Sequence, residues 1–184
     1  MYAVKSFEEA ISHHDIIRQY ANSMSVRLGC IYSKGYIYVN RGINGIEGSL
    51  STAAGYSLAS DKDVYCIIGD LSFFYDQNAL WNRNIGGNFK ILLLNNGGGA
   101  IFGKFDGLKE SNARDNLVMA KHNTSAAGIC SANHINYIEA SNAEELKAGL
   151  DKLINMKSDN PTLLEVFTDA ENDMNVLKEY YTKI

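Results

Sequence analysis

Two stretches of the chain join an apolar run to residues that can bind a metal ion. The first run ends at Gly69-Asp70-Leu71-Ser72, and the second, which begins at Lys90, ends at Asn95-Asn96-Gly97-Gly98-Gly99. An uninterrupted apolar run is typical of a strand that is buried on both faces of a parallel sheet. Because ligands gather at the carboxyl ends of such strands, we expect the carboxylate and one or both amides to converge.

The side chains at these strand ends suit a magnesium–diphosphate site. Mg²⁺ takes hard oxygen ligands, such as the carboxylate of Asp70 and an asparagine amide, and completes its shell with water and phosphate oxygens. The glycines allow the backbone to approach a ligand closely and could add a carbonyl ligand. Taken singly, both sequences are also ordinary turns. Their register across one strand–helix–strand unit, with a crossover helix within 73–84, favours the metal site.

Arginines and a serine near the start of the chain could bind carboxylate groups. Ser23 is a candidate N-cap of a helix over Met24–Tyr32, and Arg27 lies one turn further on the same face. Arg41 follows a short strand at Tyr36–Val39. A capping serine and solvent-exposed arginines are the alternative, and the spacing alone leaves it open.

Two glycine motifs match nucleotide-binding loops only in part. Glycines at 42, 45 and 48 precede a helix over Ser49–Ser60 without satisfying G-x-G-x-x-G. The stretch from Gly98 to Lys104 fits G-x-x-x-x-G-K, but Phe105 stands where a P-loop needs Ser or Thr for Mg²⁺. Ile46, the bulky apolar residue between the first glycines and their helix, could support a flat cofactor ring or fill the core.

Composition is that of a globular protein with one domain over residues 1–184. The chain is 46% hydrophobic and 21% charged, and its net charge of −4 argues against nucleic acid or an anionic membrane as a partner. It contains no apolar run long enough to span a bilayer, and residues 1–9 do not have the pattern of a signal peptide. The widely spaced Cys30, Cys66 and Cys130 indicate reduced thiols of a cytoplasmic protein. His13 and His14 are adjacent, so we expect exposed side chains rather than metal ligands.

Alternating strand and helix patterns predict a doubly wound, mostly parallel sheet of about six strands with helices on both faces. Strands are expected near residues 16, 37, 65, 91, 137 and 164. A capping box at Ser6 predicts a first helix ending near His14, and Asn142 is expected to cap a helix reaching Met156. Further helices are predicted over 124–133 and 170–184, with a long loop over 104–123.

Four ordered motifs give the chain a specific resemblance. They are Asn22-Ser23-Met24-Ser25-Val26-Arg27, Asn40-Arg41-Gly42-Ile43-Asn44-Gly45-Ile46-Glu47-Gly48, Gly69-Asp70-Leu71-Ser72-Phe73 and Asn95-Asn96-Gly97-Gly98-Gly99-Ala100-Ile101-Phe102. The Gly-Asp…Asn-Asn pair resembles the signature of thiamine-diphosphate enzymes, although that signature usually has Gly at the place of Leu71. Over about residues 15–170 the chain resembles the carboxy-terminal, diphosphate-binding domain of the MenD family, the 2-succinyl-5-enolpyruvyl-6-hydroxy-3-cyclohexene-1-carboxylate synthases of menaquinone biosynthesis, which carry Leu there.

The resemblance implies a role for each motif. Asp70, the side chain of Asn96 and the carbonyl of Gly98 would hold Mg²⁺, or Mn²⁺ in its place, against the diphosphate. Asn44, Gly45, Gly69, Leu71 and Ser72 would also contact the cofactor, and Ile46 would support its V-shaped conformation. Ser23, Arg27 and Arg41 would bind the acid groups of the substrates, and Ile101 with Phe102 would form an apolar wall near the reacting carbon.

The reaction implied by the resemblance is decarboxylation of 2-oxoglutarate on thiamine diphosphate, followed by addition of the product carbanion to isochorismate. Both substrates are dicarboxylates, which favour arginine forks. In this family an activating glutamate comes from a separate, amino-terminal pyrimidine-binding domain of a partner subunit, within a homodimer or homotetramer. Glu47 belongs to the glycine loop and is not that acid. The chain is therefore expected to be a carboxy-terminal fragment of a three-domain enzyme and inactive alone.

Two other functions fit part of the sequence. One is a different thiamine-diphosphate enzyme, of the acetolactate synthase or 2-oxoacid decarboxylase type, which would not need Arg27 and Arg41. The other is a stand-alone nucleotide- or metabolite-binding module, whose ligand binding would be indifferent to Asp70.

Overall fold

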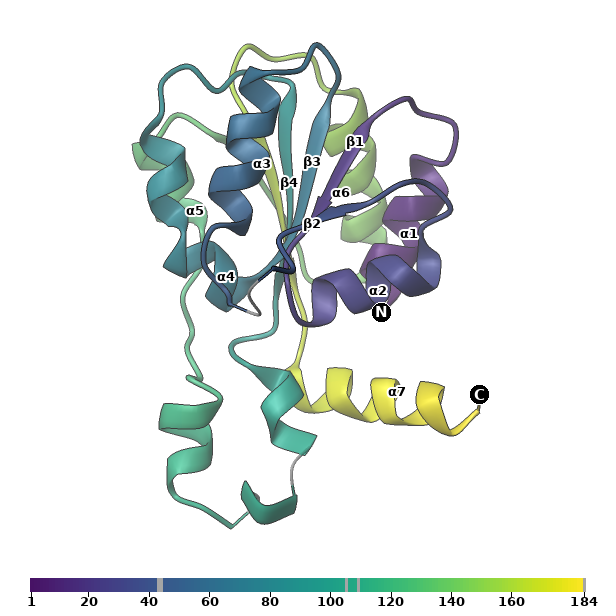
Figure 1. The fold of residues 1–184 in the computed structure, drawn as a ribbon, viewed down its shortest axis with the longest axis vertical. Coiled ribbons are helices and arrows are strands. Elements are labelled where there is room, and N and C mark those ends of the chain that lie inside the picture. The colour runs from purple at the N-terminus through teal and green to yellow at the C-terminus, as the bar shows by residue number, and fades with distance from the viewer. Residues whose placement is uncertain (43–44, 105, 109, 184) are drawn as a thin grey trace.

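The computed structural model of the chain describes residues 1–42, 45–104, 106–108 and 110–183. Its centre is a sheet of six parallel strands in the order β2-β1-β3-β4-β6-β5 (Figure 1). The strands are β1 (Ile17–Tyr20), β2 (Tyr38–Val39), β3 (Val64–Gly69), β4 (Phe89–Asn95), β5 (Asn136–Ala140) and β6 (Thr162–Phe167). The predicted doubly wound parallel sheet is confirmed.

Helices cover both faces of the sheet (Figure 1). They are α1 (Tyr2–Ala10), α2 (Met24–Tyr32), α3 (Ser49–Leu58), α4 (Asp70–Tyr75), α5 (Ala127–Ala132), α6 (Ala143–Asn155) and α7 (Ala170–Thr182). Alternate residues of a strand point to opposite faces, so Cys66 and Ile68 pack with α3, α4 and α5, whereas Tyr65 and Ile67 pack with α1, α2 and α6. Because both faces are covered, the central strands are mostly apolar, with a few buried polar residues such as Lys90 and Glu165.

Several predicted helix boundaries are wrong. The first helix does not begin at the Ser6 capping box but at Tyr2, because Ala3, Val4 and Phe7 pack into the core. The crossover helix begins at Asp70 and ends at Tyr75, and a 3₁₀ turn, η1 (Gln77–Trp81), follows it. The helix predicted over 124–133 is shortened to α5. The cap at Asn142 is confirmed, since its side chain accepts hydrogen bonds from the backbone N–H groups of Glu144 and Glu145.

The segment predicted as one long loop over 104–123 contains short helical turns. They are η2 (Ala100–Lys104) and η3 (Asp106–Leu108), both 3₁₀, and a π-helical turn, η4 (Arg114–Val118). Figure 1 shows this segment and α7 below the carboxyl edge of the sheet, apart from the two helical layers. Ala100, Met119 and Ala170 form a small apolar cluster, with Met174 packed against it, that joins the segment to the start of α7.

The strand order places a topological switch point between β1 and β3. From β1 the chain moves outward to β2, and α3 then returns it to β3 on the other side of β1. In doubly wound sheets, ligands bind in the crevice at the carboxyl ends of the strands at such a point. Ser23 follows β1 closely and Asp70 follows β3 directly, so both lie at this crevice.

Other features agree with the composition. The three cysteines are free, with Cys66 and Cys130 buried and Cys30 exposed. His13 and His14 are exposed, as expected. In the described part of the chain, no helix has the length and apolar character needed to cross a membrane.

Candidate functional site

Asp70 is a buried carboxylate at the first position of α4, with only 4% of its surface exposed. Its Oδ1 accepts a hydrogen bond from the backbone N–H of Leu71 at 2.7 Å, and its Oδ2 accepts one from the N–H of Gly98 at 2.9 Å. Burial raises the pKa of Asp70, whereas these backbone donors and His122 act against that rise. Burial disfavours the charged form of Asp70, so a cation that binds beside the carboxylate would stabilise that form.

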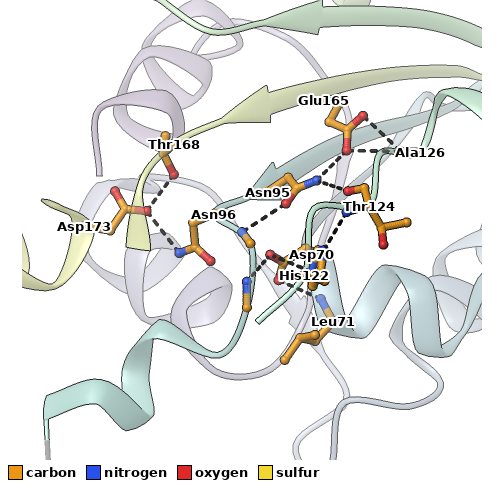
Figure 2. A network of polar contacts seen from close by, with 12 residues as sticks. Asp70, Leu71, Asn95, Asn96, His122, Thr124, Ala126, Glu165, Thr168 and Asp173 are labelled. Carbon is orange, nitrogen blue, oxygen red and sulfur yellow. Dashed lines mark hydrogen bonds and ion pairs between the residues drawn. The ribbon is translucent and has the colours of Figure 1, made fainter. Parts of the chain in front are cut away.

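His122 is a further polar neighbour of Asp70 that no sequence motif predicts. Its Nε2 lies 3.3 Å from Oδ2 of Asp70, and the ring of Phe74 packs edge-on against the imidazole (Figure 2). The backbone N–H of Thr124 donates to Nδ1 at 3.1 Å, so in the neutral ring the proton is on Nε2. This nitrogen lies beside the carboxylate but does not form a hydrogen bond with it. A lone histidine at the end of a polar loop carries no sequence signal for this role.

The two asparagines after β4 have different surroundings (Figure 2). Asn95 is buried, and its amide nitrogen donates to Glu165 Oε1 at 2.7 Å and to the carbonyl of Thr124 at 2.9 Å. Its amide oxygen accepts the N–H of Gly97 at 3.1 Å. The hydrogen-bonding capacity of Asn95 is therefore committed to protein partners, and the amide available for a ligand is that of Asn96.

Glycine is required at positions 97 and 98 because the backbone of residues 119–122 passes close to both. Their φ angles of 77° and 150° lie in the left-handed region that favours glycine. A Cβ on Gly98 would lie 2.7 Å from the carbonyl oxygen of Met119, and one on Gly97 would lie 3.0 Å from that of His122. The glycines thus admit the backbone of residues 119–122, which brings His122 to Asp70.

Ser23 does not cap α2 as predicted. It occupies the N-cap position with a φ of 68°, and its side chain makes no capping hydrogen bond. A serine in this region is strained, and such strain concentrates at functional sites. Ser23 is half-buried and lines the cavity described below.

The loop before α3 is held by two asparagines whose role the sequence motifs do not predict. The amide nitrogen of Asn22 donates to the carbonyls of Asn40 and Gly45 at 2.8 and 2.7 Å. The amide of Asn40 in turn donates to the carbonyl of Gly48 and to the hydroxyl of Thr52. These bonds tie the loop to the ends of β1 and β2, beside the switch point.

A single cavity of about 750 Å³ joins these elements. Every predicted site residue that the structure describes contributes to its lining: Ser23, Arg27, Arg41, Gly45, Ile46, Gly69, Asp70, Leu71, Ser72, Asn96, Gly98, Ile101 and Phe102. Asn44, the remaining one, lies outside the described residues. Arg27, Arg41 and Ile46 are exposed, so their side chains are accessible to a ligand. The volume is within the range of small-molecule and cofactor sites.

A metal ion here would depend on few protein ligands. Among the described residues there is no group of three or more His, Cys, Asp or Glu side chains that could hold a metal. The oxygen donors next to Asp70 are its own carboxylate, an amide oxygen at Asn96 and backbone carbonyls near Gly98. That donor set suits Mg²⁺, which keeps waters and shares phosphate oxygens, and it does not suit a closed zinc site.

Comparison with known proteins identifies the domain. The profile of the family described as "Thiamine pyrophosphate enzyme, C-terminal TPP binding domain" matches residues 22–166. The chain is also similar to three enzymes named 2-succinyl-5-enolpyruvyl-6-hydroxy-3-cyclohexene-1-carboxylate synthase. Identity is 47% with that of Phocaeicola vulgatus, 41% with that of Bacteroides thetaiotaomicron and 38% with that of Christiangramia forsetii.

These matches extend over 88%, 98% and 97% of this chain but over only 30%, 32% and 31% of the relatives. The chain therefore spans about a third of the length of the enzymes it resembles. The family profile, by contrast, covers most of the chain, and the parallel α/β fold agrees with it. The chain belongs to the thiamine pyrophosphate enzyme family, as a C-terminal TPP-binding domain.

Proposed function

We propose that the cavity at the switch point binds the diphosphate of thiamine diphosphate through Mg²⁺, or through Mn²⁺ in its place. The observation that carries this proposal is the buried carboxylate of Asp70 in the same cavity as Asn96 and Gly98, in a domain of a TPP-binding family. A carboxylate that burial makes costly to ionise favours a cation beside it. Asp70, the amide oxygen of Asn96 and the carbonyl of Gly98 are the proposed ligands.

The proposed reaction is that of the named relatives, and the residues around the cofactor site fit its substrates. Thiamine diphosphate, when bound, supplies the electron sink for decarboxylation. Arg27 and Arg41 would bind the carboxylates of 2-oxoglutarate and isochorismate, with Ser23 beside them. Ile101 and Phe102 would keep water from the reacting carbon, and Ile46 would support the bent cofactor.

The proposed activity also depends on a domain other than the TPP-binding domain. We expect the activating glutamate on a pyrimidine-binding domain of a partner subunit, as the family resemblance implies, in a homodimer or homotetramer of the complete enzyme. The 184-residue chain would then bind the diphosphate half of the cofactor without turning over. Measurable decarboxylation of 2-oxoglutarate by the purified chain would contradict this part of the proposal.

The cofactor site is tested by calorimetric titration of thiamine diphosphate into the chain, with and without Mg²⁺. We expect heat of binding only with Mg²⁺, and none in an Asp70→Ala variant. Asp61→Ala, at an exposed aspartate outside the cavity, is the matched control and should bind normally. Binding of ATP with no response to thiamine diphosphate would refute the proposal and favour a nucleotide-binding module.

The substrate class is tested separately, by removing the two arginines. The Arg27→Ala and Arg41→Ala variants should bind thiamine diphosphate normally, because neither side chain is proposed to contact it. We expect both to weaken the binding of 2-oxoglutarate to the cofactor-loaded chain. If binding persists in both and pyruvate is preferred, the acetolactate synthase type of enzyme is the better assignment.

A further inference from the structure

We infer that Asp173, on the carboxy-terminal helix α7, positions Asn96 for metal binding. This inference rests on the proposed function, because it assumes that the amide oxygen of Asn96 is a metal ligand. The amide nitrogen of Asn96 donates to Oδ2 of Asp173 at 3.1 Å, across 77 positions of sequence (Figure 2). Both residues line the cavity.

The carboxylate of Asp173 is itself held in place. The hydroxyl of Thr168, just after β6, donates to the same Oδ2 at 2.7 Å. Asp173 lies in the first turn of α7, and Asp169 caps that helix by accepting the N–H of Asn172 at 2.8 Å. The acceptor for Asn96 is therefore fixed by the end of β6 and the start of α7.

An ionised carboxylate accepts hydrogen bonds and cannot donate them, so Asn96 must turn its amide nitrogen toward Asp173. The amide is planar, and its oxygen then lies on the opposite side of the group. Figure 2 shows the nitrogen of Asn96 directed at Asp173 and the oxygen directed away from it. This oxygen accepts no hydrogen bond from the described part of the chain, which leaves it available to a cation.

Without Asp173, the side chain of Asn96 would be free to rotate between two similar orientations. Rotation about the terminal bond of asparagine is broad and roughly two-fold. One orientation presents the oxygen to the cation, whereas the other presents an N–H₂ group that repels it. Asp173 holds Asn96 in the first orientation before the metal binds. The side-chain entropy of Asn96 is therefore lost on folding rather than on binding.

The test is a double-mutant cycle on the Mg²⁺-dependent affinity for thiamine diphosphate, measured by calorimetry. Loss of a charge-assisted hydrogen bond that orders a ligand group should weaken binding about tenfold in Asp173→Ala. In the Asn96→Ala background the same change should have no further effect, because no amide remains to be oriented. If Asp173 mattered only for folding, Asp173→Ala would weaken binding equally in the wild-type chain and in the Asn96→Ala variant. Such additive losses of affinity would overturn the inference.

Two further variants separate orientation from helix charge. Glu171→Ala removes an acid from the same first turn of α7, at an exposed side chain, and should bind as wild type. Asp173→Asn keeps an acceptor oxygen and should recover affinity to within about threefold of wild type. If Asp173→Ala also binds as wild type while Asp70→Ala does not bind, only this inference fails. If the wild-type chain shows no Mg²⁺-dependent binding, the proposed function fails with it.

Hydrogen exchange supplies an independent readout. Because Asn96 joins the metal site to α7, thiamine diphosphate with Mg²⁺ should slow exchange of the backbone amides in the first turns of that helix. The slowing should disappear in Asp173→Ala even at saturating cofactor. Protection that persists in that variant would show that α7 responds to the site by another route.

Discussion

Two polar clusters lie at the carboxyl edge of the same sheet, and each combines a carboxylate with an asparagine amide. In the Glu165 cluster, the carboxylate of Glu165 is fully buried and accepts hydrogen bonds from Asn95, Ser125, Tyr137 and the backbone N–H of Ala126. In the Asp70 site, the carboxylate accepts two backbone N–H groups and faces a cavity that Asn96 shares. Figure 2 shows Glu165 with Asn95 and Ala126, together with the Asp70 site.

The two clusters contain similar residue types but differ in how far hydrogen-bond donors of the protein satisfy their side-chain oxygens. Hydrogen-bond donors from four residues converge on Glu165, so its charge is compensated inside the protein. At the Asp70 site, burial raises the pKa of the carboxyl, and the Asn96 amide oxygen is left without a donor from the described chain. A satisfied cluster holds the fold together, whereas the incompletely satisfied one at the cavity is where we propose that the metal and cofactor bind.

The largest effect on stability should come from Glu165→Gln. The new amide N–H₂ would face donors, so we expect the free energy of unfolding to fall by about 3 kcal/mol. Urea unfolding measures this change. Glu139→Gln is the control, since Glu139 is the register partner of Glu165 on β5 but is exposed, and it should change stability by less than about 0.5 kcal/mol. If both variants lost the same free energy of unfolding, Glu165 would contribute no more to stability than an exposed glutamate.

Unlike Glu165→Gln, Asp70→Asn should weaken cofactor binding strongly and change stability little. Mg²⁺-dependent affinity for thiamine diphosphate should fall by about a hundredfold or more, about 2.7 kcal/mol. Because burial raises the pKa of Asp70, the ionised form opposes folding above the carboxyl's unfolded pKa of about 4. The asparagine amide would turn its N–H₂ group toward one of the two backbone donors, which costs one hydrogen bond. With a chelator present, the two effects should nearly cancel and leave the variant within about 1 kcal/mol of wild type at pH 7. A large loss of stability at that pH would place Asp70 with the Glu165 cluster instead.

The adjacent asparagines allow the sharpest form of the comparison. Asn95→Ala leaves the N–H of Gly97 and the carbonyl of Thr124 without their partner, so stability should fall by about 2 kcal/mol. Asn96→Ala should cost less than about 0.5 kcal/mol in stability while weakening cofactor binding about tenfold. Urea unfolding and calorimetry on both variants measure the two quantities. An exchange of the two results would reverse the roles given to these residues.

Among the variants of the Glu165 cluster, Tyr137→Phe should have the smallest effect, because it removes only one of the donors to Glu165. The hydroxyl of Tyr137 lies 2.7 Å from Oε2 of Glu165, and burial together with this contact raises the pKa of the tyrosine. We expect a loss of about 1 kcal/mol in unfolding free energy, because the other donors remain. Cofactor affinity should not change. If it does, the two clusters are coupled through Asn95 and Asn96.

Much of the fold follows from local sequence. Apolar runs such as Ile91–Leu94 predict buried strands of a parallel sheet, and the alternation of strands with helices predicts helices on both faces. The bounds of α2 and the Asn142 cap of α6 follow from short-range patterns. The four motifs likewise indicate the residues that line the cavity, because each motif stands at a strand end, where a doubly wound sheet binds its ligands.

Other features depend on contacts that no local pattern encodes. The Ser6 capping box is overridden because Ala3, Val4 and Phe7 gain more from packing in the core. Ser23 has a left-handed backbone rather than a capping side chain.

The sequence by itself determined the sheet, its helical layers and the presence of a carboxylate and two amides at one edge. Only the tertiary structure decided that Asn95 joins Glu165 while Asn96 faces Asp173, and that His122 reaches Asp70. The physical reason is that successive residues at a strand end point to opposite sides. Which side joins a buried cluster and which side lines the cavity is set by β6, α7 and the segment 119–122, all distant in sequence.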